Sequence, residues 1–140
     1  MKFLIFGVGR IKDRAIEGLV SDYLKRIRCH LPIELRSVRR TEDLLRHVPS
    51  GWEVVALDER GRQVTSMGFS HIIEERMQQG RSGIVFLVGP AEGLGDLVQK
   101  ADWSLALSQM TLPHRLAYLV LAEQLYRALS IIRGEPYHKA

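Results

Sequence analysis

Short runs of apolar residues recur along the chain and predict five β-strands. Four of these runs are nearly all apolar, whereas residues 33–38 alternate apolar and polar side chains. A run of five apolar residues at positions 84–88 is typical of a central strand in a parallel sheet, because both faces of such a strand are covered. The predicted strands are residues 2–8, 33–38, 53–57, 84–88 and 103–107.

Between these strands, apolar residues recur every three or four positions, which predicts helices. Asp13 is the predicted N-cap of the first helix, Asp96 caps a short one, and Gly80 follows the third. The predicted helices are residues 13–29, a short helix from Thr41 that ends before Pro49, then 66–79, 96–101 and 114–133. Five alternations of strand and helix predict a single α/β domain over residues 1–140, a parallel sheet with helices on both faces. Residues 58–62 are interpreted as a polar turn.

The predicted helix 114–133 has an unusual distribution of side chains. One half of its circumference is apolar, whereas the other half mixes apolar residues with Glu123, Gln124, Arg127 and Ser130. An ordinary surface helix is mostly polar on its second face. The mixed face therefore predicts a homodimer contact or a site, and the alternative is a long helix that crosses a mixed core.

Composition narrows the class of protein. Hydrophobic residues make up 46% and charged residues 26% of the chain, as in ordinary globular domains. No apolar run approaches the roughly 20 residues of a membrane span, and the start of the chain does not resemble a signal peptide. The lone Cys29 excludes an intramolecular disulfide and a cysteine-cluster metal site. We therefore expect a cytoplasmic protein that binds neither membrane nor metal.

Charge is unevenly distributed. Residues 1–50 hold 11 Lys and Arg against 6 Asp and Glu, whereas the rest of the chain holds 9 against 10. A basic first third suits the phosphate backbone of a nucleic acid. A solvated basic face without a partner is the alternative.

Several enzyme motifs are absent from the sequence. Gly7 and Gly9 lack the third glycine of a dinucleotide fingerprint, because Lys12 occupies that position. The sequence contains no Walker A motif, no histidine pair at zinc-ligand spacing and no Gly-x-Ser-x-Gly elbow.

Two loops that directly follow predicted strands are the candidate ligand sites. Residues 89–95 are rich in glycine, and residues 108–114 follow the fifth strand. In open parallel sheets, ligands bind beyond the carboxyl ends of the strands. We therefore expect both loops to line one crevice, with Asp58 on the same rim. The alternative is a pair of tight turns without a ligand.

Four polar residues near the C-terminus have two interpretations each. His114 either contacts a substrate or caps backbone, and Arg127 either forms a helical salt bridge with Glu123 or contacts a phosphate. Tyr137 and His138 either form a lid or belong to a frayed tail.

Four ordered motifs resemble one known family. They are Phe-Leu-Val-Gly-Pro-Ala-Glu-Gly-Leu at 86–94, Leu-Ser-Gln-Met-Thr-Leu-Pro-His at 107–114, Glu-Gln-Leu-Tyr-Arg-Ala at 123–128 and Gly-Glu-Pro-Tyr-His-Lys at 134–139. Together they resemble the ribosomal RNA large-subunit methyltransferase H family, small SPOUT-class enzymes that methylate a pseudouridine. Pro90 departs from the family, which commonly has a second glycine there.

The resemblance implies a SPOUT α/β fold with a C-terminal deep trefoil knot, S-adenosylmethionine as cofactor and a homodimer. It implies methylation of N3 of a pseudouridine in 23S ribosomal RNA within the assembled ribosome. A transfer RNA methyltransferase and a non-catalytic ribosome-assembly factor are the alternatives. By position, the implied cofactor-binding residues are Leu57, Gly89, Leu107, Ser108, Gln109, Met110, Thr111 and Leu112. The implied catalytic residues are His114, Arg127, Tyr137 and His138.

Overall fold

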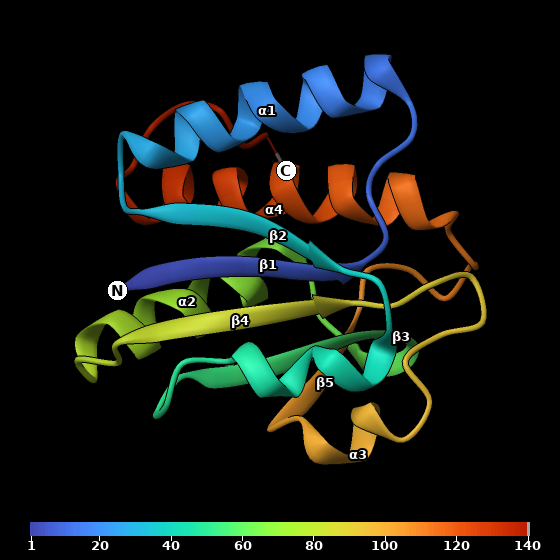
Figure 1. The fold of residues 1–140 in the computed structure, drawn as a ribbon. Helices are drawn as coiled ribbons and strands as arrows, with labels where there is room; N and C mark the ends of the chain where they lie inside the picture. Colours follow the sequence, from blue (N-terminus) through green and yellow to red (C-terminus); the bar gives the residue numbers. More distant parts are fainter. Residues whose placement is uncertain (140) are drawn as a thin grey trace.

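The computed structural model describes residues 1–139, which form a five-stranded parallel sheet. The strand order is β2-β1-β4-β3-β5, and every neighbouring pair is parallel. This places β1 and β4, the strands with the longest buried apolar runs, inside the sheet (Figure 1). The strands are β1 (Lys2–Val8), β2 (Ile33–Val38), β3 (Glu53–Gln63), β4 (Gly83–Val88) and β5 (Trp103–Ala106).

Helical elements cover both faces of the sheet. The helices α1 (Arg14–Arg28), α2 (Ser66–Gln78) and α4 (His114–Ile132) pack on one face, where α4 lies against both α1 and α2. On the other face lie α3 (Leu97–Lys100) and two 3-10 turns, η1 (Thr41–Asp43) and η2 (Leu45–His47) (Figure 1). The predicted parallel α/β sheet with helices on both faces is confirmed, and the deep trefoil knot stays a prediction.

Side-chain alternation along the strands divides the apolar residues into two cores. In β1, Phe3 and Ile5 contact the core beneath the three long helices, whereas Leu4 and Phe6 contact the core beneath α3 and the 3-10 turns. Successive side chains of a strand point to opposite faces. A strand covered on both faces therefore needs apolar residues at consecutive positions, as the chain shows in β1 and β4.

The predicted polar turn at residues 58–62 is wrong, because β3 continues through these residues to Gln63. The pairing with β5 shifts there, since Leu57 and Arg62 both align with Leu105. At Gly61 a Cβ atom would lie 2.8 Å from the carbonyl carbon of Ser104, so only glycine lets the irregular strand lie this close to β5. The segment is polar because most of its side chains are exposed.

Two further details differ from the sequence predictions. The helix expected from Thr41 to before Pro49 is the pair of 3-10 turns η1 and η2, pinned to the core by the fully buried Leu44 between them. The side chain of Asp96 makes no capping hydrogen bond to α3. By contrast, Asp13 does cap α1, because its Oδ1 accepts a hydrogen bond from the Ile16 amide at 3.1 Å.

Candidate active site

Residues of the second half of β3, together with residues at and beyond the carboxyl ends of β4 and β5, line a cleft of about 230 Å³, here called the donor cleft. The loops 89–95 and 107–113 form its two sides, so the two candidate loops do face one crevice. Lining residues include Leu57, Asp58, Glu59, Arg60, Gly89, Glu92, Leu105, Leu107, Ser108, Met110, Thr111, Leu112 and His114. Gln109, which the resemblance places with the cofactor, is exposed and does not line it.

The loop 89–95 folds back on itself. The Gly93 amide donates to the carbonyl of Pro90 at 2.8 Å, and Leu94 is buried at 4% exposure. A Cβ at Gly89 would lie 2.9 Å from the Leu94 side chain and 3.0 Å from the backbone of Gly93. The glycine is therefore explained by the return of the loop itself, which shapes that wall of the cleft.

The second loop is fastened to the extension of β3. The Ser108 hydroxyl accepts a hydrogen bond from the Met110 amide at 3.0 Å, and the Thr111 hydroxyl donates to the Glu59 carboxylate. Met110 is 77% exposed between these two anchors. Glu59 was missed by the sequence reasoning, because residues 58–62 were interpreted as a turn and no motif singled it out.

The donor cleft combines apolar walls with an acidic rim. Leucines from β3, β5 and the second loop supply the walls, and Asp58, Glu59 and Glu92 supply carboxylates. Arg60 is the one Arg or Lys among the described lining residues. This arrangement suits a ligand with a flat apolar part and a positive charge.

His114 fastens the start of α4 to the end of β1. Its Nε2 lies 2.7 Å from the carbonyl oxygen of Val8, so Nε2 carries the hydrogen and donates, which leaves Nδ1 as an acceptor. One turn later, the Tyr118 hydroxyl donates to the Gly9 carbonyl at 3.3 Å, and burial raises the pKa of Tyr118 to about 12. The structure shows the backbone contact of His114, and since His114 also lines the donor cleft, its contact with a substrate stays a prediction.

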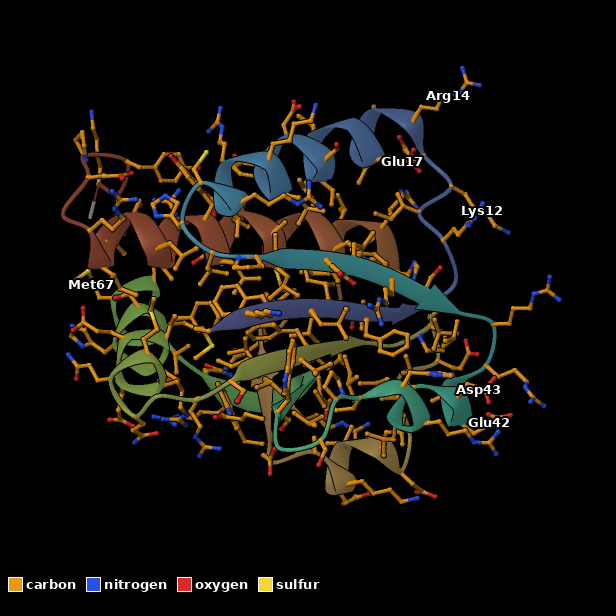
Figure 2. All side chains as sticks on the ribbon, turned by 60° about the vertical axis from the view of Figure 1, so that its left-hand side comes forward. Lys12, Arg14, Glu17, Glu42, Asp43 and Met67 are labelled. Atoms are coloured by element: carbon orange, nitrogen blue, oxygen red, sulfur yellow. The ribbon has the colours of Figure 1, made fainter. Side chains whose placement is uncertain are left out.

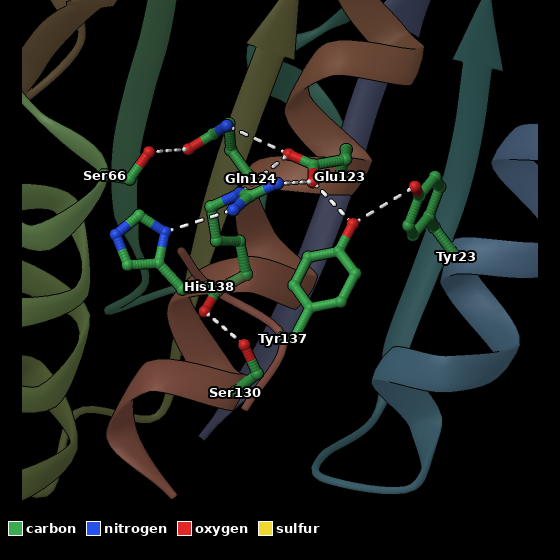
Figure 3. A network of polar contacts seen from close by, with 8 residues as sticks. Tyr23, Ser66, Glu123, Gln124, Ser130, Tyr137 and His138 are labelled. Atoms are coloured by element: carbon green, nitrogen blue, oxygen red, sulfur yellow. Dashed lines mark hydrogen bonds and ion pairs between the residues drawn. The ribbon is translucent and has the colours of Figure 1, made fainter. Parts of the chain in front are cut away.

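At the other end of α4, the C-terminal tail docks on a network centred on Glu123 (Figure 3). Arg127 donates to both carboxylate oxygens, with Nη2 to Oε2 at 2.6 Å and Nε to Oε1 at 3.3 Å. The Tyr137 hydroxyl donates to Oε2 at 2.6 Å and lies 3.3 Å from the Tyr23 hydroxyl of α1. Gln124 links the carboxylate to Ser66 at the start of α2.

The network holds its groups in defined charge states. Partial burial opposes ionisation of Glu123, but hydrogen bonds from Arg127 and Tyr137 outweigh it, so the pKa of Glu123 is lowered. The hydrogen bond to Glu123 raises the pKa of Arg127. Burial, together with the bond to Glu123, raises the pKa of Tyr137. A carboxylate, a guanidinium and a neutral phenol therefore coexist at neutral pH.

His138 is attached to the same network through Arg127. The guanidinium Nη1 lies 3.1 Å from Nδ1 of the imidazole, and the Arg127 Cζ lies 4.8 Å from the centre of the Tyr137 ring. A guanidinium can only donate, so Nδ1 accepts and the hydrogen of neutral His138 is on Nε2. The tail also has backbone anchors, because Gly134 adopts φ +71° and the Glu135 amide donates to Ser130 at 2.9 Å.

The structure thus separates the predicted site residues into two groups. His114 lies at the donor cleft, whereas Arg127, Tyr137 and His138 lie together near the opposite end of α4. With 1.5 Å of rise per residue, His114 and Arg127 are about 20 Å apart along the helix axis. Glu123 is the centre of the second group, although the sequence indicates it only as a salt-bridge partner of Arg127.

Among residues 1–139, no group of three or more His, Cys, Asp or Glu side chains is arranged to hold a metal ion. Within the same part of the chain, no helix combines the length and the apolar composition that crossing a bilayer requires.

In open parallel α/β sheets, ligands bind at the carboxyl edge of the strands, which is where the donor cleft lies. The family model described as "Predicted SPOUT methyltransferase" matches residues 1–138. The chain therefore belongs to the SPOUT methyltransferase family and is an enzyme of that class, as the resemblance implied.

Similar proteins span the full length of the chain. A protein of Ruminiclostridium cellulolyticum is 40% identical over 99% of this chain and 100% of its own. One of Nitrosospira multiformis is 40% identical over 100% of both, and one of Syntrophotalea carbinolica is 38% identical over 99% of both. All three are named "Ribosomal RNA large subunit methyltransferase H".

Proposed function

We propose that this enzyme transfers a methyl group from S-adenosylmethionine to N3 of a pseudouridine in large-subunit (23S) ribosomal RNA, within the assembled ribosome. The observation that carries the proposal is the full-length similarity to proteins named as large-subunit ribosomal RNA methyltransferases. The donor cleft supports it, because it is built from the same loops that carry the family resemblance.

The residues of the donor cleft fit S-adenosylmethionine. Leu57, Leu107 and Leu112 offer apolar surface for the adenosine, the backbone of the segment 107–112 offers hydrogen-bonding groups, and the acidic rim faces the positive charge. Gly89 keeps the opposite loop folded back, which leaves room for the ligand. When bound, this cofactor supplies an electrophilic methyl group on a sulfonium. The chain then has to align the base with the methyl group and to promote removal of the N3 proton.

Tyr137, His138 and Arg127 are the proposed contacts to the base. The Tyr137 ring provides an apolar face for stacking, and Arg127 supplies positive charge for an anionic base or a phosphate. With Nδ1 of His138 held by Arg127, Nε2 presents a hydrogen and acts as a donor that orients a base oxygen. For His138 to accept the N3 proton instead, its contact with Arg127 has to break.

The separation of the two groups along α4 supports a homodimer. Within one chain, about 14 Å of helix lies between His114 and Glu123, which holds Tyr137, and about 20 Å lies between His114 and Arg127, which holds His138. Direct methyl transfer requires contact between the base and the donor, so both separations are too long. A second copy that crosses α4 in the opposite direction brings its tail to the donor cleft of the first. Leu112, just before α4, and Leu116, Val120 and Ile131 of α4 are partly exposed and provide apolar contacts.

Mixing two inactive variants tests this arrangement. Gly89→Ala disturbs the donor cleft, and His138→Ala removes the tail imidazole. If each active site takes its cleft from one subunit and its tail from the other, mixed dimers contain one site with both parts intact. Activity then reappears on mixing, whereas mixtures that stay inactive contradict the shared site.

Methylation assays on separated RNA pools test the reaction. With labelled S-adenosylmethionine, we expect methylation of assembled ribosomes, weak activity on naked 23S RNA and none on transfer RNA. Mass mapping of the product then locates the methyl group. Methylation of transfer RNA alone supports the first alternative, and absence of cofactor binding by calorimetry supports a non-catalytic assembly factor.

A further inference from the structure

A second cleft of about 420 Å³ adjoins the donor cleft. Its walls are the β1–α1 connection and the first residues of α4. Pro90, Ala91 and His114 line both clefts, so the two cavities meet at these three residues. A ligand in the second cleft is therefore a direct neighbour of a ligand in the first.

The charge of the second cleft is opposite to that of the donor cleft. Arg10, Lys12 and Arg115 line it, and Asp13 is its one carboxylate. Asp13 is already engaged, because it caps α1 and its other oxygen lies 3.9 Å from Arg115. Arg10 and Lys12 form no ion pair with residues 1–139, and Lys12 extends into solvent from the connection (Figure 2). Two cations are thus available to an anion.

The β1–α1 connection, which carries Arg10 and Lys12, is fixed by contacts on both sides of these residues. Ile11, between Arg10 and Lys12, is buried at 7% exposure. The preceding carbonyls of Val8 and Gly9 accept hydrogen bonds from His114 and Tyr118 of α4. The two side chains are therefore presented by a backbone fixed on both sides, which lowers the entropic cost of binding.

We propose that the second cleft binds a backbone phosphate of the RNA strand, next to the nucleotide whose base enters the donor cleft. Arg10 and Lys12 supply the charge, since guanidinium and ammonium groups are the usual phosphate ligands. Phosphate contacts of this kind fix the register of a nucleic acid without reading its sequence. This inference rests on the proposed function, because it assigns the RNA as the ligand of a site beside the methyl donor.

The test compares two double variants of equal charge change. Arg10→Gln with Lys12→Gln removes the cations of the second cleft. Lys2→Gln with Arg81→Gln is the matched control, because exposed Lys2 begins β1 and exposed Arg81 lies just before β4, at the edge of the sheet opposite the second cleft. For each protein we measure the Kd of a single-stranded RNA oligonucleotide at several salt concentrations. We also measure the Kd of S-adenosylmethionine and the kcat and KM for assembled ribosomes that lack the modification.

The cleft variant is expected to bind the oligonucleotide roughly ten-fold more weakly and with a salt slope smaller by about 1, since one phosphate contact is lost. Its KM for ribosomes rises with little change in kcat, its Kd for S-adenosylmethionine stays constant, and the control keeps wild-type values. Equal losses in both variants overturn the proposal, since they indicate a diffuse charge effect. A weaker Kd for S-adenosylmethionine in the cleft variant also overturns it, because the anion is then the carboxylate of the cofactor.

These outcomes separate the inference from the proposed function. If the wild-type enzyme methylates no ribosomal RNA but the cleft variant alone loses oligonucleotide affinity, the phosphate site stands and the proposed reaction falls. If the wild-type enzyme methylates ribosomes and the cleft variant matches it in KM, affinity and salt slope, the reaction stands and the phosphate site falls.

Discussion

The phenol of Tyr137 donates a 2.6 Å hydrogen bond to the carboxylate of Glu123, fourteen residues earlier in the chain. The same carboxylate binds Arg127, which in turn contacts His138. One acidic side chain of α4 therefore holds the tail in place. The two aromatic residues that we propose to meet the substrate base depend on it for their position.

Replacement of this carboxylate should release the tail. Glu123→Gln leaves the Arg127 guanidinium without its counter-charge and weakens the Tyr137 bond, so we expect a loss of roughly 1–3 kcal/mol in the free energy of unfolding. Turnover should fall by roughly ten-fold or more, as a displaced tail raises the barrier by at least about 1.4 kcal/mol. Calorimetry should show an unchanged Kd for S-adenosylmethionine, because Glu123 does not line the donor cleft and the tail that it holds is proposed to contact the base rather than the cofactor.

The control for this variant is Glu135→Gln in the same tail. Glu135 contacts Arg133 at 3.7 Å across a well-exposed pair, which contributes little to stability. Urea unfolding should show a change below about 0.5 kcal/mol. Equal effects of the two substitutions would indicate that Glu123 has no special role in docking the tail.

Docking of the tail should weaken in acid. The pKa of Glu123 is lowered in the folded chain from its ordinary value of 4.5, so its contribution to stability is present above that value. It is lost as the pH falls through the folded pKa. NMR spectra recorded from pH 7 downward should show the Tyr137 ring signals shifting only below about pH 4.5. The same signals should not titrate in Glu123→Gln, and a transition near neutral pH would refute this assignment.

Removal of the tail imidazole tests its role in the reaction. The imidazole is proposed either to orient a base oxygen or to accept the N3 proton. His138→Ala should therefore lower kcat by roughly 10²–10⁴-fold. The Kd for S-adenosylmethionine should stay nearly constant. Unchanged turnover on ribosomes would remove His138 from the mechanism.

The donor loop offers an independent prediction at the other end of α4. Thr111→Val removes the hydrogen bond to Glu59 while keeping the shape of the side chain, so affinity for S-adenosylmethionine should fall by roughly three- to ten-fold. Thr111→Ser keeps the hydroxyl and should bind as the wild type does. Glu59→Ala also removes a carboxylate of the acidic rim, so it should lose at least as much affinity as Thr111→Val, and Thr111→Val should cause no further loss in the Glu59→Ala background. Additive losses would show that the two residues act separately.

Much of the fold follows from local patterns. The apolar run at 84–88 and the helical spacing of apolar residues in α1 and α4 predict these elements, because the apolar positions are the ones that are buried. The irregular end of β3 could not be predicted in this way. The residues around Gly61 are polar and exposed, and such a sequence is equally typical of a turn and of a strand at the edge of a sheet. Its strand character comes from pairing with β5, about forty residues later.

The candidate site divides in the same way. Loops that follow strands are expected at the carboxyl edge of a parallel sheet, so the donor cleft follows from topology. The hydrogen bond of Tyr137 to Glu123 does not follow from topology, because the tail reverses direction at Gly134 before it reaches Glu123. Likewise, the contact of His114 with Val8 joins residues 106 positions apart, which no spacing rule relates.

The close contact between Gly7 and Tyr118 gives a final prediction about the packing of α4 on β1. A Cβ at Gly7 would lie 1.6 Å from the Tyr118 hydroxyl oxygen, so Gly7→Ala should displace this ring and lower the free energy of unfolding by roughly 1–3 kcal/mol. The same substitution at Gly18, in the exposed part of α1 with nothing within 4 Å, should instead raise it by up to about 1 kcal/mol. Urea unfolding of both variants measures the difference. Equal stability of Gly7→Ala and Gly18→Ala would show that Tyr118 does not pack against β1. It would then also contradict the hydrogen bond from the Tyr118 hydroxyl to the Gly9 carbonyl.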